Sequence, residues 1–323
     1  MLKLKFNILC CVLFLALLNL TLGYSLYGIS HPVDLVSVNP QDASITQIGS
    51  IISHESLGDN LGSLDNKNKI YYFLGTNLTD SKIDLVGLNL DPNQGEIGSI
   101  RYEVRTPFIT ASYIGIGEIC SVDSNTGDVI VMGRDPKYNY QHNLIRVTPQ
   151  TGKLQELAQF KFIDFGSDSH VYANGIEWIQ FAVKQDNQTA SKLVAFDTYS
   201  GSQLYEIDDK YFLSGLNYDQ ATNSIYGLGL KPPNYYTRVV VKFNPNNQLF
   251  TELLELPHQF LLMAPMTTYN PKDQILYYYL NSGKITDPLY LVEISLKYNK
   301  IINSPLGCKN INECIMDLHY SSE

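Results

Sequence analysis

The sequence contains little cysteine, little tryptophan and little charge. Its 323 residues include five cysteines, one tryptophan and 17% charged residues, and Lys and Arg are nowhere gathered into a run. Nucleic acids and anionic membranes are bound by clustered Lys and Arg, so a net charge of −9 without such clusters argues against both as partners. No C-x-x-C or H-x-x-H spacing accompanies the cysteines, which argues against a zinc site built on them.

Apolar runs long enough to cross a membrane are also missing. An apolar stretch at residues 8–18 follows two lysines, and it is followed by Asn19 and by Thr21 and Gly23, which suit the −3 and −1 positions of a signal-peptidase site. This pattern is typical of a secretory signal peptide, and an uncleaved anchor is the weaker interpretation because the stretch is short and Asn19 interrupts it. We therefore predict a signal peptide at 1–23 and an exported, extracellular chain over 24–323. Its net charge would be −11, since the signal peptide removes two lysines.

Three cysteines and two glycosylation sequons remain in the exported chain. Cys308 and Cys314 are six residues apart and are predicted to form a short disulfide loop, whereas Cys120 lies in a strand-like run and is predicted to be a buried thiol rather than a nucleophile. The sequons begin at Asn77 and Asn187, both in polar segments. In an exported chain we expect glycosylation of at least one of the two.

Six short apolar strands recur at a near-constant spacing. They begin at residues 35, 85, 144, 193, 240 and 291, so that successive starts differ by 50, 59, 49, 47 and 51 residues. Each ends at Asn, Thr, Asp or Ser and a polar turn, and a further strand follows. No stretch has a sustained apolar period of 3.6 residues, so helices are predicted to be minor.

A second kind of hairpin precedes most of these strands. It occurs at 62–75, 120–133, 215–229 and 267–280, and the segment 171–183 has the same form around an Asn-Gly turn. Each unit is therefore four short strands joined by turns. A period near 50 with four strands is typical of a β-propeller blade, so the sequence predicts an all-β fold with six four-stranded antiparallel blades.

The two ends of the chain are predicted to share one blade. The first unit begins at 24–30 with a segment that matches a second strand, so it lacks an innermost strand. The last unit is complete by about Ile302, and the strand-like segment 313–321 is left over. A C-terminal strand that completes the first blade would close the ring without an exposed sheet edge. The prediction is one propeller domain over 24–323, with the 308–314 disulfide beside the last blade.

The segments "NKIYYFLG" and "NSIYGLG" resemble the second strand of six-bladed propellers of the NHL and YWTD kind. The resemblance extends over the exported chain at the level of architecture. The YWTD tetrapeptide, the Kelch glycine pair and the WD dipeptide are absent. The resemblance therefore implies the propeller superfamily, and it implies neither a specific family nor a partner.

The connections between second and third strands are long, whereas those on the opposite face are mostly tight turns. Long loops on a rigid platform indicate the working face. Four loop tyrosines there can stack on sugars or anchor a protein, or can simply pin their own loops: Tyr138, Tyr140, Tyr235 and Tyr236. We predict a non-enzymatic recognition module without a cofactor, which binds an extracellular protein or carbohydrate through this face.

A resemblance to six-bladed lactonases and gluconolactonases implies an alternative, a calcium-dependent hydrolase with its cation in the channel. Alignment of the inner strands places Asn60 and Glu118 at one depth, and Asp59, Asp168 and Glu313 are the further residues that could complete the site. Ca²⁺ usually takes six to eight oxygen ligands, so this set is small, and solvated residues at the channel mouth are the simpler interpretation.

Three further segments resemble catalytic or metal-binding motifs only weakly. Segment 166–170, "GSDSH", brings Ser, Asp and His together in sequence only. Segment 53–58, "SHESLG", begins like a zinc-protease helix but lacks the second histidine. Segment 123–128, "DSNTGD", is explained more simply as a hairpin turn stabilised by its aspartate than as a calcium loop.

Overall fold

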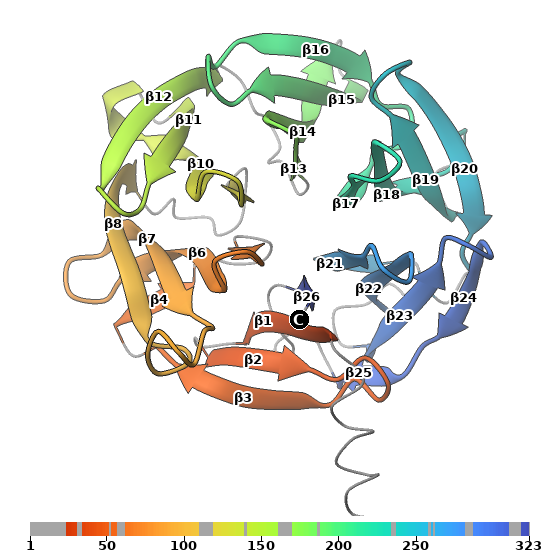
Figure 1. The fold of residues 1–323 in the computed structure, drawn as a ribbon. Helices are drawn as coiled ribbons and strands as arrows, with labels where there is room; N and C mark the ends of the chain where they lie inside the picture. Colours follow the sequence, from red (N-terminus) through yellow and green to blue (C-terminus); the bar gives the residue numbers. More distant parts are fainter. Residues whose placement is uncertain are drawn as a thin grey trace, which may run out of the picture.

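The computed structural model describes residues 24–30, 34–51, 53–56, 62–109, 119–138, 141–160, 170–185, 188–233, 237–257, 260, 262–281, 287–309 and 318–322. Within these residues the strands form six sheets, arranged as blades around a central axis (Figure 1). The helical structure described is one short 3-10 helix, η1 (Pro136–Tyr138). In the described part of the chain, no helix is both long and apolar enough to span a membrane.

The blades are numbered from the N-terminus, and their strands are given from the axis outward. Blade 1 contains β26 (His319–Ser322), β1 (Tyr24–Ser30), β2 (Asp34–Val38) and β3 (Ile45–Ser50). Blade 2 contains β4 (His54–Ser56), β5 (Gly62–Asp65), β6 (Ile70–Asn77), β7 (Lys82–Asn89) and β8 (Ile100–Ile109). Blade 3 contains β9 (Ile119–Asp123), β10 (Asp128–Asp135), β11 (Gln141–Thr148) and β12 (Lys153–Phe160).

The second half of the ring continues in the same order. Blade 4 contains β13 (His170–Ala173), β14 (Ile176–Gln185), β15 (Gln188–Asp197) and β16 (Gln203–Asp208). Blade 5 contains β17 (Ser214–Asp219), β18 (Ser224–Leu230), β19 (Arg238–Asn244) and β20 (Leu249–Glu255). Blade 6 contains β21 (Leu262–Asn270), β22 (Ile275–Asn281), β23 (Leu289–Ser295), β24 (Lys300–Asn303) and β25 (Leu306–Cys308).

The C-terminal strand closes the ring, as predicted. Strand β26 pairs antiparallel with β1 in a register that places Tyr24 opposite Ser322 and Tyr27 opposite His319. Blade 1 is therefore assembled from both ends of the described chain. Strand β26 is its innermost strand, so β1 is paired on both sides like the second strand of every other blade (Figure 1). The predicted all-β class, the six blades and the closure by a C-terminal strand are confirmed.

Acidic and amide side chains fix the turns between the first and second strands of the blades. The Asp65 carboxylate accepts hydrogen bonds from the backbone N–H groups of Lys67 and Asn68, at 3.1 and 3.0 Å. The same arrangement occurs at the end of four inner strands, at Asp65, Asp123, Asp219 and Asn270. In blade 4 the two-residue turn Asn174–Gly175 replaces it, with positive φ angles of 52° and 84°.

The core is divided into six apolar clusters, one between each pair of neighbouring blades. Strand β6 shows how one strand serves two of them. Tyr71 and Phe73 pack against blade 1, whereas Tyr72 and Leu74 pack against blade 3. Because successive side chains of a strand point to opposite faces, burial of both faces requires a continuous apolar run. This explains the runs of apolar residues in β6 and β22.

Two blades depart from four continuous strands. In blade 2 the inner strand is divided into β4 and β5, both of which pair with β6. In blade 6 the outer edge is divided into β24 and β25, both paired with β23. Cys308 ends β25 and is buried beside the last blade, where the sequence placed it. Its pairing with Cys314, which lies outside the described residues, stays a prediction.

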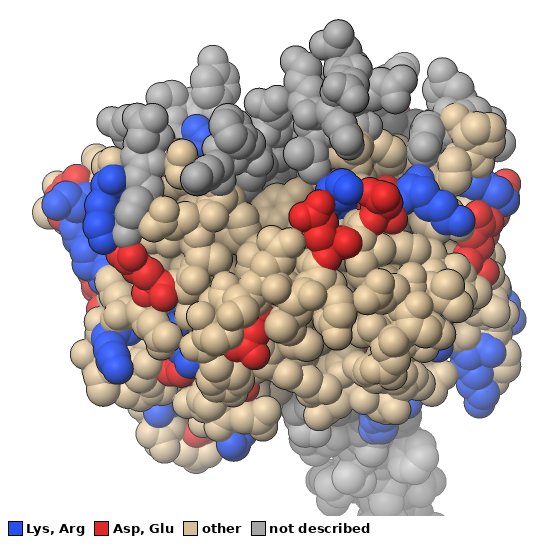
Figure 2. All heavy atoms as spheres, turned by 90° about the horizontal axis from the view of Figure 1, so that it is seen from above, with Lys and Arg blue, Asp and Glu red and all other residues tan. Residues whose placement is uncertain are grey.

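Charge is dispersed over the side of the ring. Figure 2 shows acidic and basic side chains interspersed among uncharged ones, without a large patch of either sign on this side of the described surface. Exposed ion pairs occur among the described residues, such as Lys137 with Glu156 at 2.7 Å and Lys192 with Asp208 at 2.5 Å. Exposed pairs of this kind contribute little to stability.

The closing segment should stabilise the whole ring, because its side chains complete the interface between blades 6 and 1. Leu318 is fully buried beside Leu26 and Tyr320 between blades 6 and 1. We expect Leu318→Ala to lower the free energy of unfolding by about 2–5 kcal/mol, because it leaves a cavity in this interface. Leu306→Ala is the matched control, since this leucine is 54% exposed, and it should change stability by no more than about 0.5 kcal/mol. Urea unfolding measures both, and equal midpoints for the two variants would contradict the closure.

Candidate functional site

A cavity of about 700 Å³ lies on the axis of the ring. All six innermost positions contribute to its wall, through β5, β9, β13, β17, β21 and β26. The lining combines apolar side chains such as Leu64 and Leu216 with hydroxyl, amide, imidazole and phenol groups, and examples of the polar groups are Ser121, His170, Tyr172, Asn217, Tyr218 and Thr267. The volume lies within the range of small-molecule sites, and the six strands hold its wall rigidly.

The cavity reaches the tight-turn face of the ring. Its lining includes residues of the turns that follow inner strands, among them Asn66, Ser124, Gln220 and Pro271. Because neighbouring strands are antiparallel, these turns lie at the opposite end of the blade from the loops between second and third strands. Among the described residues, the cavity lining therefore includes the face opposite the long loops that the sequence indicated.

A histidine in the wall is oriented by a buried carboxylate. His170 Nδ1 lies 3.1 Å from Glu177 Oε1 and 2.9 Å from Ser121 Oγ, and the Ser121 hydroxyl donates to the same carboxylate oxygen at 2.9 Å. Glu177 is fully buried, and its Oε2 has no hydrogen-bond partner among the described residues. The trio joins blades 3 and 4 across their interface.

This trio orients the imidazole but does not activate the serine. In a Ser-His-acid triad, the acid and the nucleophile contact opposite ring nitrogens. Here Ser121 and Glu177 meet at the same nitrogen, Nδ1, and the serine hydroxyl already donates to the carboxylate. With Nδ1 bonded to these oxygens, Nε2 is the ring nitrogen that is left for another contact. The geometry therefore supports ligand binding by His170 rather than acyl transfer through Ser121.

The Asp123 carboxylate is shared by two tyrosines, of which Tyr172 lines the cavity. The Tyr199 hydroxyl donates to Asp123 Oδ2 at 3.1 Å. Burial opposes ionisation of Asp123, but hydrogen bonds from the Asn125 amide and from Tyr172, among others, outweigh it and lower the pKa of this carboxyl. Burial and then the charge of Asp123 raise the pKa of Tyr172. Tyr172 thus remains a neutral phenol at physiological pH.

Most of the predicted site residues lie outside the described residues. These are Tyr140, Tyr235, Tyr236, Asn60, Glu118, Asp168 and Asn187. Tyr138 ends η1, and only its backbone is described. The predicted loop-tyrosine surface and the channel calcium site therefore stay predictions. Cys120 is buried in β9, as expected.

Asn77 is the predicted modification site that the structure describes. Its amide nitrogen donates to Asp84 Oδ2 at 3.0 Å and to Glu103 Oε1 at 3.4 Å. A glycan is attached to this nitrogen, so a glycosylated Asn77 would lose at least one of the two hydrogen bonds. Glycosylation here stays a prediction that requires a different side-chain position.

One residue in the sequence, Glu177, is a signal for the histidine group. Segment 166–170 ends at His170, but its neighbours in sequence are not its partners, which are 49 and 7 residues away. Glu177 is the charged residue in the largely apolar second strand "IEWIQFAV". A charged residue in a strand that is buried on both faces indicates a buried polar contact.

Comparison with known proteins supports the fold. No protein-family profile and no curated protein matches this sequence. Among solved structures, the chain is similar to TolB from Acinetobacter baumannii, with a TM-score of 0.62 and 12% sequence identity over 93% of this chain and 67% of that chain. At this identity the likeness concerns architecture alone, and it agrees with a six-bladed β-propeller.

A substitution at Asp123 tests whether its carboxylate stabilises the hairpin turn or binds calcium. We expect Asp123→Asn to be less stable than wild type at pH 7, because the lowered pKa means that the fold favours the ionised carboxylate. This contribution is present above the ordinary Asp pKa of 3.8 and is lost as the pH falls through the lower folded value. The difference in unfolding midpoint should therefore shrink in acid. Calcium-dependent stability that the variant abolishes would contradict the turn interpretation.

Proposed function

We propose that this propeller is an exported, non-enzymatic recognition module that holds a neutral carbohydrate in its axial cavity. The observation that carries the proposal is the lining of that cavity, where side chains from all six blades present hydroxyl, amide and phenol groups. Hydroxyl and amide groups match the alternating donors and acceptors of a sugar. Tyrosine rings supply flat apolar area for the C–H face of a pyranose.

The charges disfavour an anionic ligand. The chain carries a net charge of −9, and the cavity wall includes Asp219. Both features disfavour an anionic ligand. The polar groups are also held in place before binding, since Asn217 donates to Thr267 Oγ1 at 2.8 Å and Tyr218 donates to Asn223 at 2.9 Å. Such preorganisation lowers the entropic cost of binding. The loop tyrosines on the opposite face would serve a protein partner instead.

Binding to immobilised neutral oligosaccharides tests this proposal. We expect wild-type protein to bind a subset of them and Tyr218→Ala to bind about tenfold more weakly or worse, because the variant removes an aromatic contact from the wall. Tyr298→Ala is the matched control, since this tyrosine is 62% exposed and does not line the cavity. Tyr218 also packs against the apolar cluster between blades 4 and 5, so binding is compared at a temperature at which circular dichroism shows both variants to be folded.

Three outcomes would overturn the proposal. The first is no binding of any oligosaccharide by the wild type. The second is binding that survives Tyr218→Ala but is lost in the double variant Tyr235→Ala/Tyr236→Ala, which would place the ligand on the long-loop face. The third is calcium-dependent turnover of lactone or ester substrates that Glu118→Ala abolishes, which would favour the hydrolase alternative.

Export is tested separately by peptide mass mapping of protein secreted from a eukaryotic host. We expect a mature chain that begins at Tyr24, a Cys308–Cys314 disulfide, and a glycosidase-sensitive glycan with higher occupancy at Asn187 than at Asn77. The difference in occupancy follows from the two inward hydrogen bonds of the Asn77 amide. Retained Met1, or free thiols at both positions 308 and 314, would contradict the proposal.

A further inference from the structure

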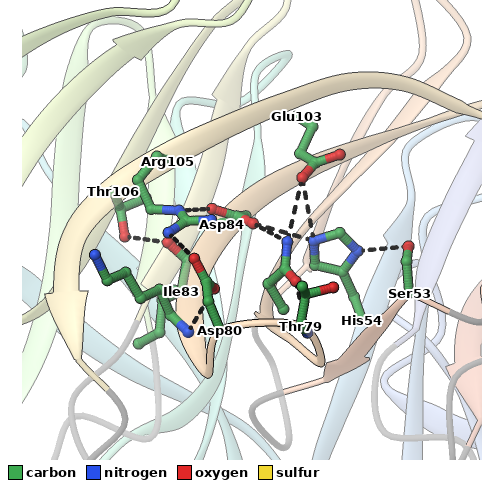
Figure 3. A network of polar contacts seen from close by, with 11 residues as sticks. Ser53, His54, Thr79, Asp80, Ile83, Asp84, Glu103, Arg105 and Thr106 are labelled. Atoms are coloured by element: carbon green, nitrogen blue, oxygen red, sulfur yellow. Dashed lines mark hydrogen bonds and ion pairs between the residues drawn. The ribbon is translucent and has the colours of Figure 1, made fainter.

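A second polar group lies in blade 2, away from the cavity (Figure 3). It draws on every layer of the blade, with His54 from β4, Asn77 from β6, Asp84 from β7 and Glu103 from β8. His54 and Asp84 are both almost completely buried, whereas the Glu103 side chain is 45% exposed. A buried histidine and a buried aspartate thus face an acid that is open to solvent.

Three ligand atoms of this group converge on one point. His54 Nε2 lies 3.2 Å from Asp84 Oδ2 and 3.8 Å from Glu103 Oε1, and all three atoms lie within 4.8 Å of one another. The amide nitrogen of Asn77 lies between the two carboxylates and donates to both. A hydrogen-bond donor therefore lies where the two carboxylates direct their negative charge.

The charge of the group is only partly compensated by protein cations. Arg105 donates to Asp84 Oδ1 at 2.5 Å and to Asp80 at 2.7 Å. These contacts leave Asp84 Oδ2 and Glu103 facing the histidine. Hydrogen bonding to Arg105 lowers the pKa of Asp80, so this carboxylate stays ionised. Arg105 thus pairs with Asp80 and Asp84, whereas Glu103 faces His54 and Asn77. A divalent cation beside Asp84 Oδ2 would reduce the repulsion between the Asp84 and Glu103 carboxylates.

We propose that His54, Asp84 and Glu103 bind a divalent transition metal of the zinc class. One imidazole nitrogen with two carboxylate oxygens is a set that zinc accepts, whereas calcium prefers oxygen ligands alone. Rotation of the Asn77 amide would present its oxygen as a fourth ligand, and water can take that place from the Glu103 side. Ser53 Oγ contacts His54 Nδ1 at 2.9 Å, which holds the ring with Nε2 toward the carboxylates.

The competing explanation is a hydrogen-bonded network that needs no metal. Asp84 already accepts from His54, Asn77 and Arg105, which satisfies a buried carboxylate without any ion. The two explanations differ at Glu103. Its half-exposed carboxylate adds little to a purely structural network, but it supplies one of three ligands to a metal. The proposal does not depend on carbohydrate binding, since the group lies outside the cavity lining.

Zinc titration of the chelator-treated full chain, followed by calorimetry, tests the site. We expect one Zn²⁺ per chain and a dissociation constant that Glu103→Gln raises by about tenfold or more. Glu156→Gln is the matched control, since it removes a carboxylate of similar exposure that pairs with Lys137 in blade 3. This control should bind zinc like the wild type. Co²⁺ should give visible absorption with a nitrogen ligand, and His54→Gln should abolish it.

Two results of the zinc titration would overturn the proposal. If wild-type protein takes up less than one Zn²⁺ at micromolar concentrations, the network is purely structural. If Glu103→Gln binds zinc as tightly as Glu156→Gln does, the metal lies elsewhere. Glu103→Gln keeps the test informative even if His54→Gln fails to fold, because Glu103 lies at the surface, and its melting temperature should match that of the wild type without metal.

Discussion

The fold depends on the burial of both faces of every blade. Each of the six apolar clusters lies between two blades, so no blade has a core of its own. A blade with a neighbour on one side only would expose a full apolar face to water, at a cost of about 25 cal/mol for each Å². The ring must therefore close. The pairing of β26 with β1 performs that closure and completes the cluster between blades 6 and 1.

The same constraint divides the molecule into apolar and polar regions. Second and third strands are apolar on both faces because they lie between blades, whereas inner strands also face the axis. Polar side chains on inner strands can therefore contact water or a ligand without disturbing the interfaces. The His170 group uses this freedom at the boundary of blades 3 and 4. The His54 group uses the end of blade 2, where the inner strand is divided into β4 and β5.

The architecture was predictable because its signals are local. A turn residue such as Asp123 caps its own hairpin within four residues, and the repeat of such hairpins near every 50 residues indicates blades. The polar groups were less accessible to prediction, because their partners come from different strands. Ser121 and His170 are 49 residues apart, and His54 and Asp84 are 30 apart. Asp84 in "IDLVGL" and Glu177 in "IEWIQF" were the available signals, but neither identifies its partner.

The pairing of β1 with β26 also has a mechanical consequence. Tyr24 lies opposite Ser322, so the two ends of this antiparallel pair leave the ring at the same point. A pulling force applied to both ends would break the hydrogen bonds of the pair one after another, starting at Tyr24 and Ser322, rather than all at once. Blade 1 would open under a small force while blades 2 to 6 still held their interfaces. A tether at one end alone would leave this pair unloaded, so the way in which the chain is anchored would determine how much tension the ring withstands.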